Sequence, residues 1–267
     1  MTLVGTHDVL MVTLDTLRYD VAAESLSAGK TPVLASVLPG AQWEERHSPA
    51  TFTYAAHQAI FAGILPTPAR PGPHPRRFAL RFAGSESTGP ETCVFDAPDI
   101  VSGFADRGYH TLCVGGVGFF NLQNPLGCVL PGLFQEQHWR LELGVTEPRS
   151  TEFQVAQIAQ SLAALPDQQR SFTFLNVSAL HQPNKHYLPG ARADSKQTQA
   201  AALEYVDTQL SSLFAVAARR APCFVMIGSD HGTAYGEDGY TGHRIAHPVV
   251  STVPWAEFTL PQGWGAP

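Results

Sequence analysis

Four short runs of apolar residues stand out along the chain. They cover residues 9–14, 110–114, 171–176 and 223–228, and each is largely apolar throughout instead of alternating with polar residues. Such a run is typical of a strand in a parallel sheet, because helices cover both faces of that sheet and leave neither face to water. The pattern therefore predicts four buried parallel strands.

Segments with helical periodicity lie between these runs. They cover residues 53–63, 97–107, 151–165 and 196–219, and the last carries apolar residues on one face and Gln, Glu and Asp on the other. Strands that alternate with helices form βαβ units. We therefore expect an α/β fold, a mostly parallel β-sheet sandwiched between helices, as a single domain over residues 1–267 with a poorly ordered tail at 259–267.

Two segments have no regular pattern, residues 67–90 and residues 115–132. Long loops in a compact domain often bind ligands or act as lids, although surface padding is an equally good interpretation of the first one. That loop is rich in Pro, Gly and Arg, and Arg70, Arg76 and Arg77 could form a rim that attracts anions.

The charge balance and hydropathy exclude two classes of partner. The 267 residues include 23 acids and 17 bases, with a net charge of −6 and no long basic run, which argues against binding to a nucleic-acid backbone. No window reaches the roughly 18 apolar residues of a membrane span, and the first residues lack the features of a signal peptide. We expect neither nucleic acid nor membrane as a partner.

The four cysteines, Cys93, Cys113, Cys128 and Cys223, form no C-x-x-C pair. Cys113 and Cys223 lie inside apolar runs, where a free thiol behaves as a small hydrophobic side chain. This usage predicts a reduced, cytoplasmic location.

Candidate metal ligands follow three of the predicted strands. Asp15 comes directly after the first, Asp230 and His231 follow the last, and His181 lies five residues beyond the third. Carboxyl ends of parallel strands meet at one edge of a sheet, where ligands bind. Carboxylates mixed with imidazoles suit zinc, manganese or iron. We predict a site for one or two divalent ions, with zinc as the first candidate.

Thr53 is a candidate nucleophile because it begins a predicted helix. Free N–H groups and the helix dipole favour negative charge there, and a bound metal would lower the pKa of the hydroxyl. His57 is one turn further on the same face and could reach a substrate oxygen or the nucleophile. From this stretch alone, a simple N-cap role for Thr53 is the stronger interpretation.

Three segments, in this order, resemble the alkaline phosphatase superfamily and specifically its sulfatase-like branch, in which small bacterial metalloenzymes and hydrolases are known. They are "VLMVTLDTLRYD", "SPATFTYAAHQAIFAGILP" and "SDHG" followed by "GHR". "HQPNKHYLP" is similar to a degenerate form of that branch's Pro-His-x-Pro loop. The resemblance covers residues 9–258 and implies an alkaline-phosphatase-like fold.

The resemblance implies roles for individual residues. Asp15 matches the first-strand metal ligand, and Asp230 with His231 matches the ligand pair of the same ion. Thr53, ten residues before Gly63, stands where sulfatases carry a cysteine that becomes formylglycine. Threonine at this position is instead similar to the phosphodiesterase, phosphatase and phosphoglycerate mutase relatives.

A second ion is less well supported. His243 and His181 match its two histidines, but Val177 stands four residues before His181, where those relatives have an aspartate. The resemblance therefore leaves open either a weak second site or a single ion. Asn176 and Arg18 are candidates for substrate binding; a structural salt bridge is an equal alternative for Arg18.

The implied function is a metal-dependent hydrolase or transferase that acts on a small anionic substrate, a phosphate ester or phosphodiester. Thr53 would form a covalent phospho-threonine intermediate. Two alternatives stay open, a sulfate-ester hydrolase without formylglycine and a non-catalytic accessory protein. In the second case the chain would act beside partner enzymes of a pathway.

Overall fold

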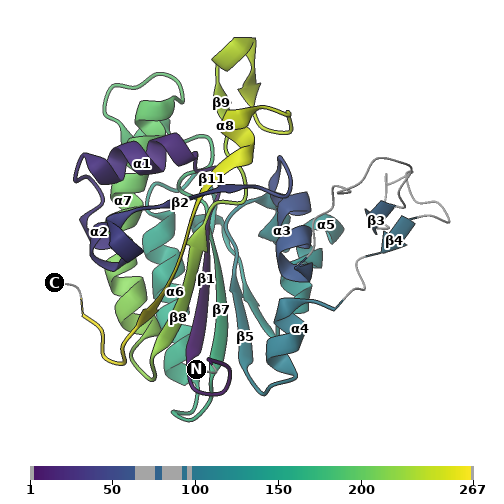
Figure 1. Cartoon of the computed structure of the whole chain (residues 1–267). Helices are drawn as coiled ribbons and strands as arrows, with labels where there is room; N and C mark the ends of the chain where they lie inside the picture. Colours follow the sequence, from purple (N-terminus) through teal and green to yellow (C-terminus); the bar gives the residue numbers. More distant parts are fainter. Residues whose placement is uncertain (1–2, 64–75, 80–91, 95–97, 266–267) are drawn as a thin grey trace.

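The computed structural model describes residues 3–63, 76–79, 92–94 and 98–265. Its centre is a seven-stranded sheet with the order β2-β11-β8-β1-β7-β5-β6 (Figure 1). The strands are β1 (Asp8–Leu14), β2 (Glu44–His47), β5 (His110–Val114), β6 (Glu136–His138), β7 (Ser171–Val177), β8 (Cys223–Gly228) and β11 (Thr252–Leu260). The run from β8 to β6 is parallel, which confirms the four predicted strands and the mostly parallel sheet.

Helices cover both faces of the sheet (Figure 1). One face carries α1 (Tyr19–Ser27), α2 (Pro32–Val37), α6 (Ser150–Ala164) and α7 (Lys196–Ala217). The other carries α3 (Thr53–Ala62), α4 (Ile100–Ala105) and α5 (Pro125–Val129). The four predicted helices are present, so the α/β architecture is confirmed.

Shorter elements complete the chain. Two small ladders pair β3 (Arg76–Ala79) with β4 (Thr92–Val94) and β9 (Ala234–Tyr235) with β10 (Thr241–Gly242). Helix α8 (Pro248–Ser251) leads into β11. Single turns of 3₁₀ helix are η1 (Pro39–Ala41), η2 (Gly118–Phe120), η3 (Pro131–Leu133), η4 (Leu141–Leu143), η5 (Lys185–Tyr187) and η6 (Glu237–Gly239).

The central strand β1 shows why the strand sequences are apolar throughout. Leu10, Val12 and Leu14 belong to the cluster under α1, α2, α6 and α7, whereas Val9 and Met11 belong to a second cluster on the opposite face. Alternate residues of a strand point to opposite faces, so both faces of β1 need apolar side chains. Burial of each contributes about 1.5–3 kcal/mol.

The predicted disorder of the tail at 259–267 is wrong for its described part. Strand β11 continues to Leu260 and pairs antiparallel with β8. Trp264 then packs edge-on against Phe214 of α7, with ring centroids 5.8 Å apart. This segment is held by a ladder and an aromatic contact, which give it a fixed path despite its mixed sequence.

The two long loops have different outcomes. Residues 115–132 are not irregular throughout, because η2, α5 and η3 form within them. Of residues 67–90, only the strand β3 lies within the described part of the chain. Arg70 lies outside the described residues, and so do the side chains of Arg76 and Arg77, so the predicted anion-attracting rim stays a prediction.

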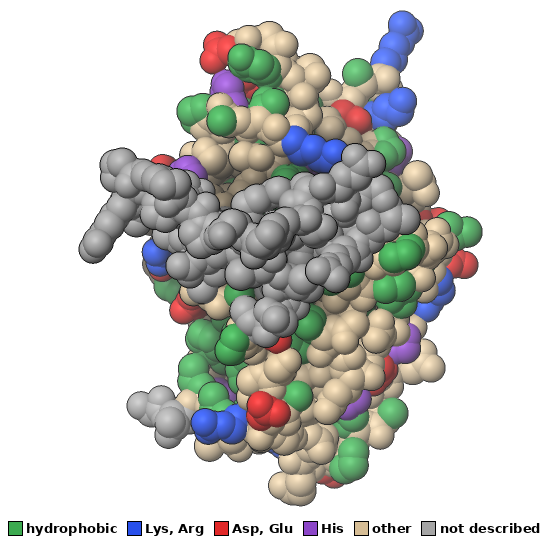
Figure 2. Space-filling view, turned by 90° about the vertical axis from the view of Figure 1, so that its right-hand side faces the viewer, with side chains coloured by type: hydrophobic (Ala, Val, Ile, Leu, Met, Phe, Trp, Pro, Cys, Tyr) green, Lys and Arg blue, Asp and Glu red, His purple; other side chains and the backbone are tan. Residues whose placement is uncertain are grey.

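Two features concern the predicted absence of nucleic-acid and membrane partners, namely the distribution of basic side chains and the hydropathy of the helices. On the face in Figure 2, Lys and Arg side chains of the described residues stand in several separate places instead of gathering in one patch. Over the described ranges, no helix is both long enough and apolar enough to cross a membrane. The absence of nucleic acid and membrane as partners stays a prediction.

Candidate metal centre and pocket

Three candidate ligands meet where neighbouring strands end. Asp15 follows β1, and Asp230 with His231 follows β8, which pairs directly with β1. One ligand atom from each residue lies within 4.8 Å of the others, and all three side chains are fully buried. The strand-end argument thus places these residues together, although opposite ends of the chain supply them.

Each of the two carboxylates leaves one oxygen without a partner. Asp15 Oδ2 accepts a hydrogen bond from Asn176 Nδ2 at 2.9 Å, while Asp15 Oδ1 is buried and unpaired. Asp230 Oδ1 accepts from the backbone N–H groups of Thr16 at 3.3 Å and of His231 at 3.0 Å, while Asp230 Oδ2 is buried and unpaired. A buried, unpaired carboxylate oxygen is costly. Both oxygens fit a divalent cation between them.

The imidazole of His231 has the orientation of a metal ligand. Its Nδ1–H donates to the carbonyl of Gly232 at 2.8 Å, so the lone pair is on Nε2. Nε2 lies 3.5 Å from Asp230 Oδ2 and 3.2 Å from the Thr53 hydroxyl. A hydrogen bond that fixes the remote ring nitrogen is the usual arrangement around ligating histidines.

The electrostatics of the centre favour a cation. Burial, and then the negative charge of Asp230, raises the pKa of Asp15 to about 6. Burial raises the pKa of Asp230 to about 7. Burial also lowers the pKa of His231, so its ring is held neutral. Two acids that resist ionisation side by side become good ligands once a positive ion offsets their charge.

Thr53 is the first residue of α3, and its side chain does not cap the helix. The N-cap position belongs to Phe52, and there is no side-chain capping bond. The Thr53 hydroxyl instead faces Nε2 of His231 at 3.2 Å. The start of a helix also presents free N–H groups and a positive dipole end. The N-cap interpretation therefore does not describe this residue.

His57 lies beneath the site instead of facing the pocket. Its Nδ1–H donates to the Thr53 carbonyl at 2.7 Å, and its Nε2 accepts from the Thr13 hydroxyl at 3.0 Å. The ring is fully buried, which lowers its pKa to about 4. Three aromatic rings surround it, those of Phe61, Phe120 and Phe174. The expected contact with a substrate oxygen does not fit this placement, because both ring nitrogens are engaged; His57 ties α3 to β1.

The side chains of Asn176 and Arg18 also contact other residues of the protein and do not line the pocket. Asn176 donates to Asp15, and its Oδ1 accepts from the N–H of Val117 at 2.9 Å, so both ends of the amide are taken. Arg18 is only 2% exposed and pairs with Asp20 at 2.7 Å and with Glu237. Asn176 thus orients a metal ligand, and the salt-bridge alternative describes Arg18. Neither lines the pocket, so their expected substrate contacts are not seen.

His181 and His243 lie next to the three-ligand cluster. The ring of His243 is 5.7 Å from that of His181 and 4.7 Å from that of His231. Burial, and then the two neighbouring histidines, lowers the pKa of His243 to about 3, so its ring is neutral. Val177 is fully buried in the core and supplies no ligand. Over the described ranges only the Asp15 cluster groups three ligands, so a second ion stays a prediction.

A pocket of about 540 Å³ opens over the nucleophile. Its described lining includes Thr53, His181 and His243, together with residues that the sequence did not single out, Phe119, Asn121, Asn124 and Arg244. Arg244 directly follows His243 in the "GHR" motif, and this adjacency was the one available signal for it. The pocket places open space beside the candidate nucleophile.

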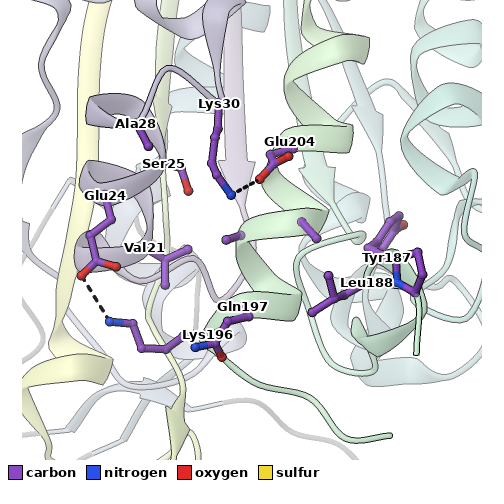
Figure 3. A pocket seen from close by; sticks show the side chains of 13 residues that line it. Val21, Glu24, Ser25, Ala28, Lys30, Tyr187, Leu188, Lys196, Gln197 and Glu204 are labelled. Atoms are coloured by element: carbon purple, nitrogen blue, oxygen red, sulfur yellow. Dashed lines mark hydrogen bonds and ion pairs between the residues drawn. The ribbon is translucent and has the colours of Figure 1, made fainter. Parts of the chain in front are cut away.

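A larger cleft of about 720 Å³ lies away from this chemistry, between α1, η5 and α7 (Figure 3). Its walls include none of the candidate ligands. The charges at its rim are paired, Lys30 with Glu204 at 2.8 Å and Lys196 with Glu24 at 3.3 Å (Figure 3). Its larger volume favours this cleft as a ligand-binding site. The buried titratable groups beside Thr53 instead favour the smaller pocket as the functional site.

Comparison with known proteins identifies the fold. No family model matches the chain, and no curated protein does. Among solved structures, the periplasmic domain of phosphoethanolamine transferase EptC from Campylobacter jejuni shares 16% identity at a TM-score of 0.61, covering 95% of this chain and 80% of that one. Its Escherichia coli counterpart, in complex with zinc, shares 13% at 0.63, covering 97% and 74%.

A protein of the alkaline phosphatase superfamily from Vibrio parahaemolyticus has the same architecture, with 13% identity and a TM-score of 0.54, covering 98% of this chain and 62% of that one. The chain therefore has the alkaline-phosphatase fold, as the sequence motifs indicated. At these identities the likeness establishes the fold alone.

The predicted cytoplasmic location is wrong on this comparison, because the EptC structures of the same fold are periplasmic domains. The prediction depended on the cysteines. Three of them, Cys113, Cys128 and Cys223, are free. The first and last are buried, where burial raises the thiol pKa and keeps the group unreactive. Buried, inert thiols do not report the redox compartment.

Proposed function

We propose that this protein is a metal-dependent transferase or hydrolase of phosphate esters, with Thr53 as the nucleophile. One observation carries the proposal. The Thr53 hydroxyl donates to the Nε2 lone pair of His231 at 3.2 Å, in the same centre as two buried carboxylate oxygens that have no hydrogen-bond partner among the described residues. The phosphoethanolamine transferases of the same fold support this reaction class.

Asp15, Asp230, His231 and Thr53 would hold the ion. This donor set, two carboxylates with an imidazole and a hydroxyl, suits zinc, and manganese or iron are alternatives. The zinc complex of the E. coli neighbour agrees with the choice of zinc. When bound, the ion would lower the pKa of the threonine hydroxyl and offset charge on the phosphoryl oxygens.

The protein's own residues would position the reaction. The Thr53 hydroxyl loses its proton to solvent, and its oxygen forms a bond to phosphorus while the bond between phosphorus and the ester oxygen breaks. The ester oxygen leaves as an anion that takes up a proton from water, and a phospho-threonine remains for transfer to water or to an acceptor. Negative charge at Thr53 is favoured because the residue begins α3, where the dipole is positive. His57 fixes the Thr53 backbone through its carbonyl, and Asn176 fixes Asp15.

Intact-protein mass spectrometry tests the proposal. Zinc-loaded protein is mixed with 4-nitrophenyl phosphate or bis(4-nitrophenyl) phosphate and quenched rapidly. We expect a phosphoryl or phosphodiester adduct on Thr53 and release of nitrophenol. Thr53→Ala should lose the adduct and at least about a hundredfold in kcat, the scale for removing a covalent route.

Thr51→Ala is the matched control. Thr51 precedes the helix, and its contact with Arg244 is a hydrogen bond between the two backbones, which the substitution leaves in place. It should keep the adduct. Wild-type turnover by Thr53→Ala would overturn the covalent route. Faster cleavage of 4-nitrophenyl sulfate than of either phosphate would favour the sulfate-ester alternative, and no turnover of any ester by metal-loaded protein would favour an accessory role.

A further inference from the structure

The lining of the pocket over Thr53 includes three side chains that can donate hydrogen bonds. Arg244, Asn121 and Asn124 lie there beside the apolar ring of Phe119. No aspartate or glutamate is among the described residues that line it. We therefore consider which chemical group of the substrate, apart from the reacting phosphate, these residues could bind.

Arg244 is a cation held close to the nucleophile. Its backbone N–H donates to the carbonyl of Thr51 at 2.8 Å, and its guanidinium lies 5.5 Å from the centre of the Phe52 ring. Both contacts are with the segment that leads into Thr53. The residue has a left-handed backbone, φ 70°, which is unusual for a residue other than glycine.

The guanidinium of Arg244 has no carboxylate partner among the residues that the structure describes. Other arginines near the site, such as Arg18, are neutralised by two acids. Arg244 instead lines the pocket, and its guanidinium lies over the Phe52 ring next to Thr53. An unpaired guanidinium at a pocket wall is suited to binding an anion through charge-assisted hydrogen bonds.

The two asparagines present donors as well. Asn121 Oδ1 accepts from the N–H of Gln123 at 3.1 Å, and Asn124 Oδ1 accepts from the N–H of Gly127 at 2.8 Å, where it caps α5. Both carbonyl oxygens are thus engaged, and no described residue accepts a hydrogen bond from either Nδ2 group, so these groups can donate to a ligand. Together with Arg244 they form a wall that offers donors.

We infer that the non-reacting part of the substrate carries an acidic group, a carboxylate or a second phosphate, and that Arg244 determines this specificity. The inference rests on the proposed function, because it assigns the reacting phosphorus to Thr53. A substrate ammonium, as in a phosphoethanolamine group, would meet the charge of Arg244 with no acid in the described lining to receive it. The pocket therefore selects against cationic groups.

A matched series of phosphodiesters tests this specificity. Each is a 4-nitrophenyl alkyl phosphate whose alkyl chain ends in a carboxylate, a methyl group or an ammonium. For zinc-loaded wild type we expect kcat/KM to fall in that order. Arg244→Gln should lower the carboxylate-to-methyl ratio by about tenfold or more, the scale of a charge-assisted hydrogen bond. Arg244→Lys should retain part of the ratio.

Asn124→Asp provides the reciprocal variant. Aspartate keeps an oxygen for the cap of α5, so the helix is preserved, while the second oxygen replaces a donor with an anion. We expect its ammonium-to-methyl ratio to rise. A wild-type preference for the ammonium ester, or a carboxylate-to-methyl ratio that Arg244→Gln leaves unchanged, would overturn the inference.

The same esters are also titrated calorimetrically into zinc-loaded Thr53→Ala protein. The order of Kd should match the order of kcat/KM, with the carboxylate ester bound most tightly and its advantage reduced in the Thr53→Ala, Arg244→Gln double variant. The order of Kd tests the specificity of the pocket for an acidic group even if Thr53 is not the nucleophile. A failed mass-spectrometric adduct would then count against the proposed function alone.

Discussion

The two buried acids of the candidate metal centre are expected to cost the metal-free protein stability, by an amount that grows as the pH rises through their pKa values. The pKa values of Asp15 and Asp230 rise from 3.8 to about 6 and about 7. Between about pH 4 and pH 7 the folded chain therefore keeps protons that the unfolded chain has released. Since the unfolded state binds fewer protons at these two sites, their contribution to the free energy of unfolding falls as the pH rises. The lowered pKa values of His57 and His243 contribute in the opposite direction over an overlapping range, so the effect of the acids is isolated by comparing variants at one pH.

The magnitude follows from these shifts. Each pKa unit corresponds to about 1.4 kcal/mol, so the shift of Asp230 represents about 4 kcal/mol at pH 8. Asp230→Asn removes this charge. The amide oxygen can still accept the N–H groups of Thr16 and His231, as Oδ1 does now. We expect the metal-free variant to be more stable than wild type at pH 8 by up to that amount, roughly 8–15 °C in Tm.

Zinc should offset most of this difference. At a free concentration about a hundredfold above Kd, the ion stabilises wild type by about 2.7 kcal/mol, and the increment should grow from pH 5 to pH 8 as protons leave the ligands. Asp230→Asn should lose most of this response. Thermal unfolding followed by circular dichroism, with EDTA or with zinc across this pH range, measures both effects.

Asp207→Asn is the control. Asp207 is also buried, but its two oxygens accept the N–H groups of Val33 at 3.0 Å and Leu34 at 2.9 Å. An asparagine cannot accept both, so this variant should lose stability and keep the full zinc response. The reasoning is refuted if metal-free Asp230→Asn is less stable than wild type at pH 8, or if zinc protects the two proteins equally.

Three further outcomes follow from the contacts at the site. Asn176→Ala, which removes the hydrogen bond that orients Asp15, should weaken zinc binding about tenfold or more in competition with a chelating dye, with little change in helix content. Gly232→Ala should destabilise the protein and reduce its zinc content, since the new Cβ would lie 2.0 Å from the Val249 carbonyl oxygen; Gly118→Ala, which meets nothing within 4 Å, should do neither. If His181 and His243 bind a second ion, replacing both with alanine should lower the metal content measured by mass spectrometry from about two ions per chain to about one; an unchanged content would show that they bind none.

The central strands and the metal cluster could be predicted from the sequence, because both follow from simple rules. A strand covered on both faces must be apolar throughout, and ligands at the ends of adjacent parallel strands must meet. The edge strands do not follow such rules. Strand β2 consists of the polar, exposed residues Glu44–His47, and β11 contains Pro254. Their pairing depends on the neighbour that they meet and not on their own pattern.

The roles of His57 and Arg18 depended on side-chain direction, which spacing does not give. His57 does lie one turn after Thr53, but its ring lies among aromatic rings of the core instead of in the pocket. Arg18 does lie three residues after Asp15, but Asp20 and Glu237 receive its guanidinium. Arg244 could not be ranked above other arginines, because the lack of an acidic partner for it among the described residues is a property of the folded chain.

The position of β8 beside β1 has a consequence for how the protein acquires its metal. Asp15 directly follows the first strand and His231 follows the eighth, yet the two must be adjacent before the three candidate ligands meet. A nascent chain therefore carries the first ligand long before the ribosome has made the last two. If the proposed ion binds, all three candidate ligands can hold it only after β8 has paired with β1, so metal binding would follow the formation of the central sheet.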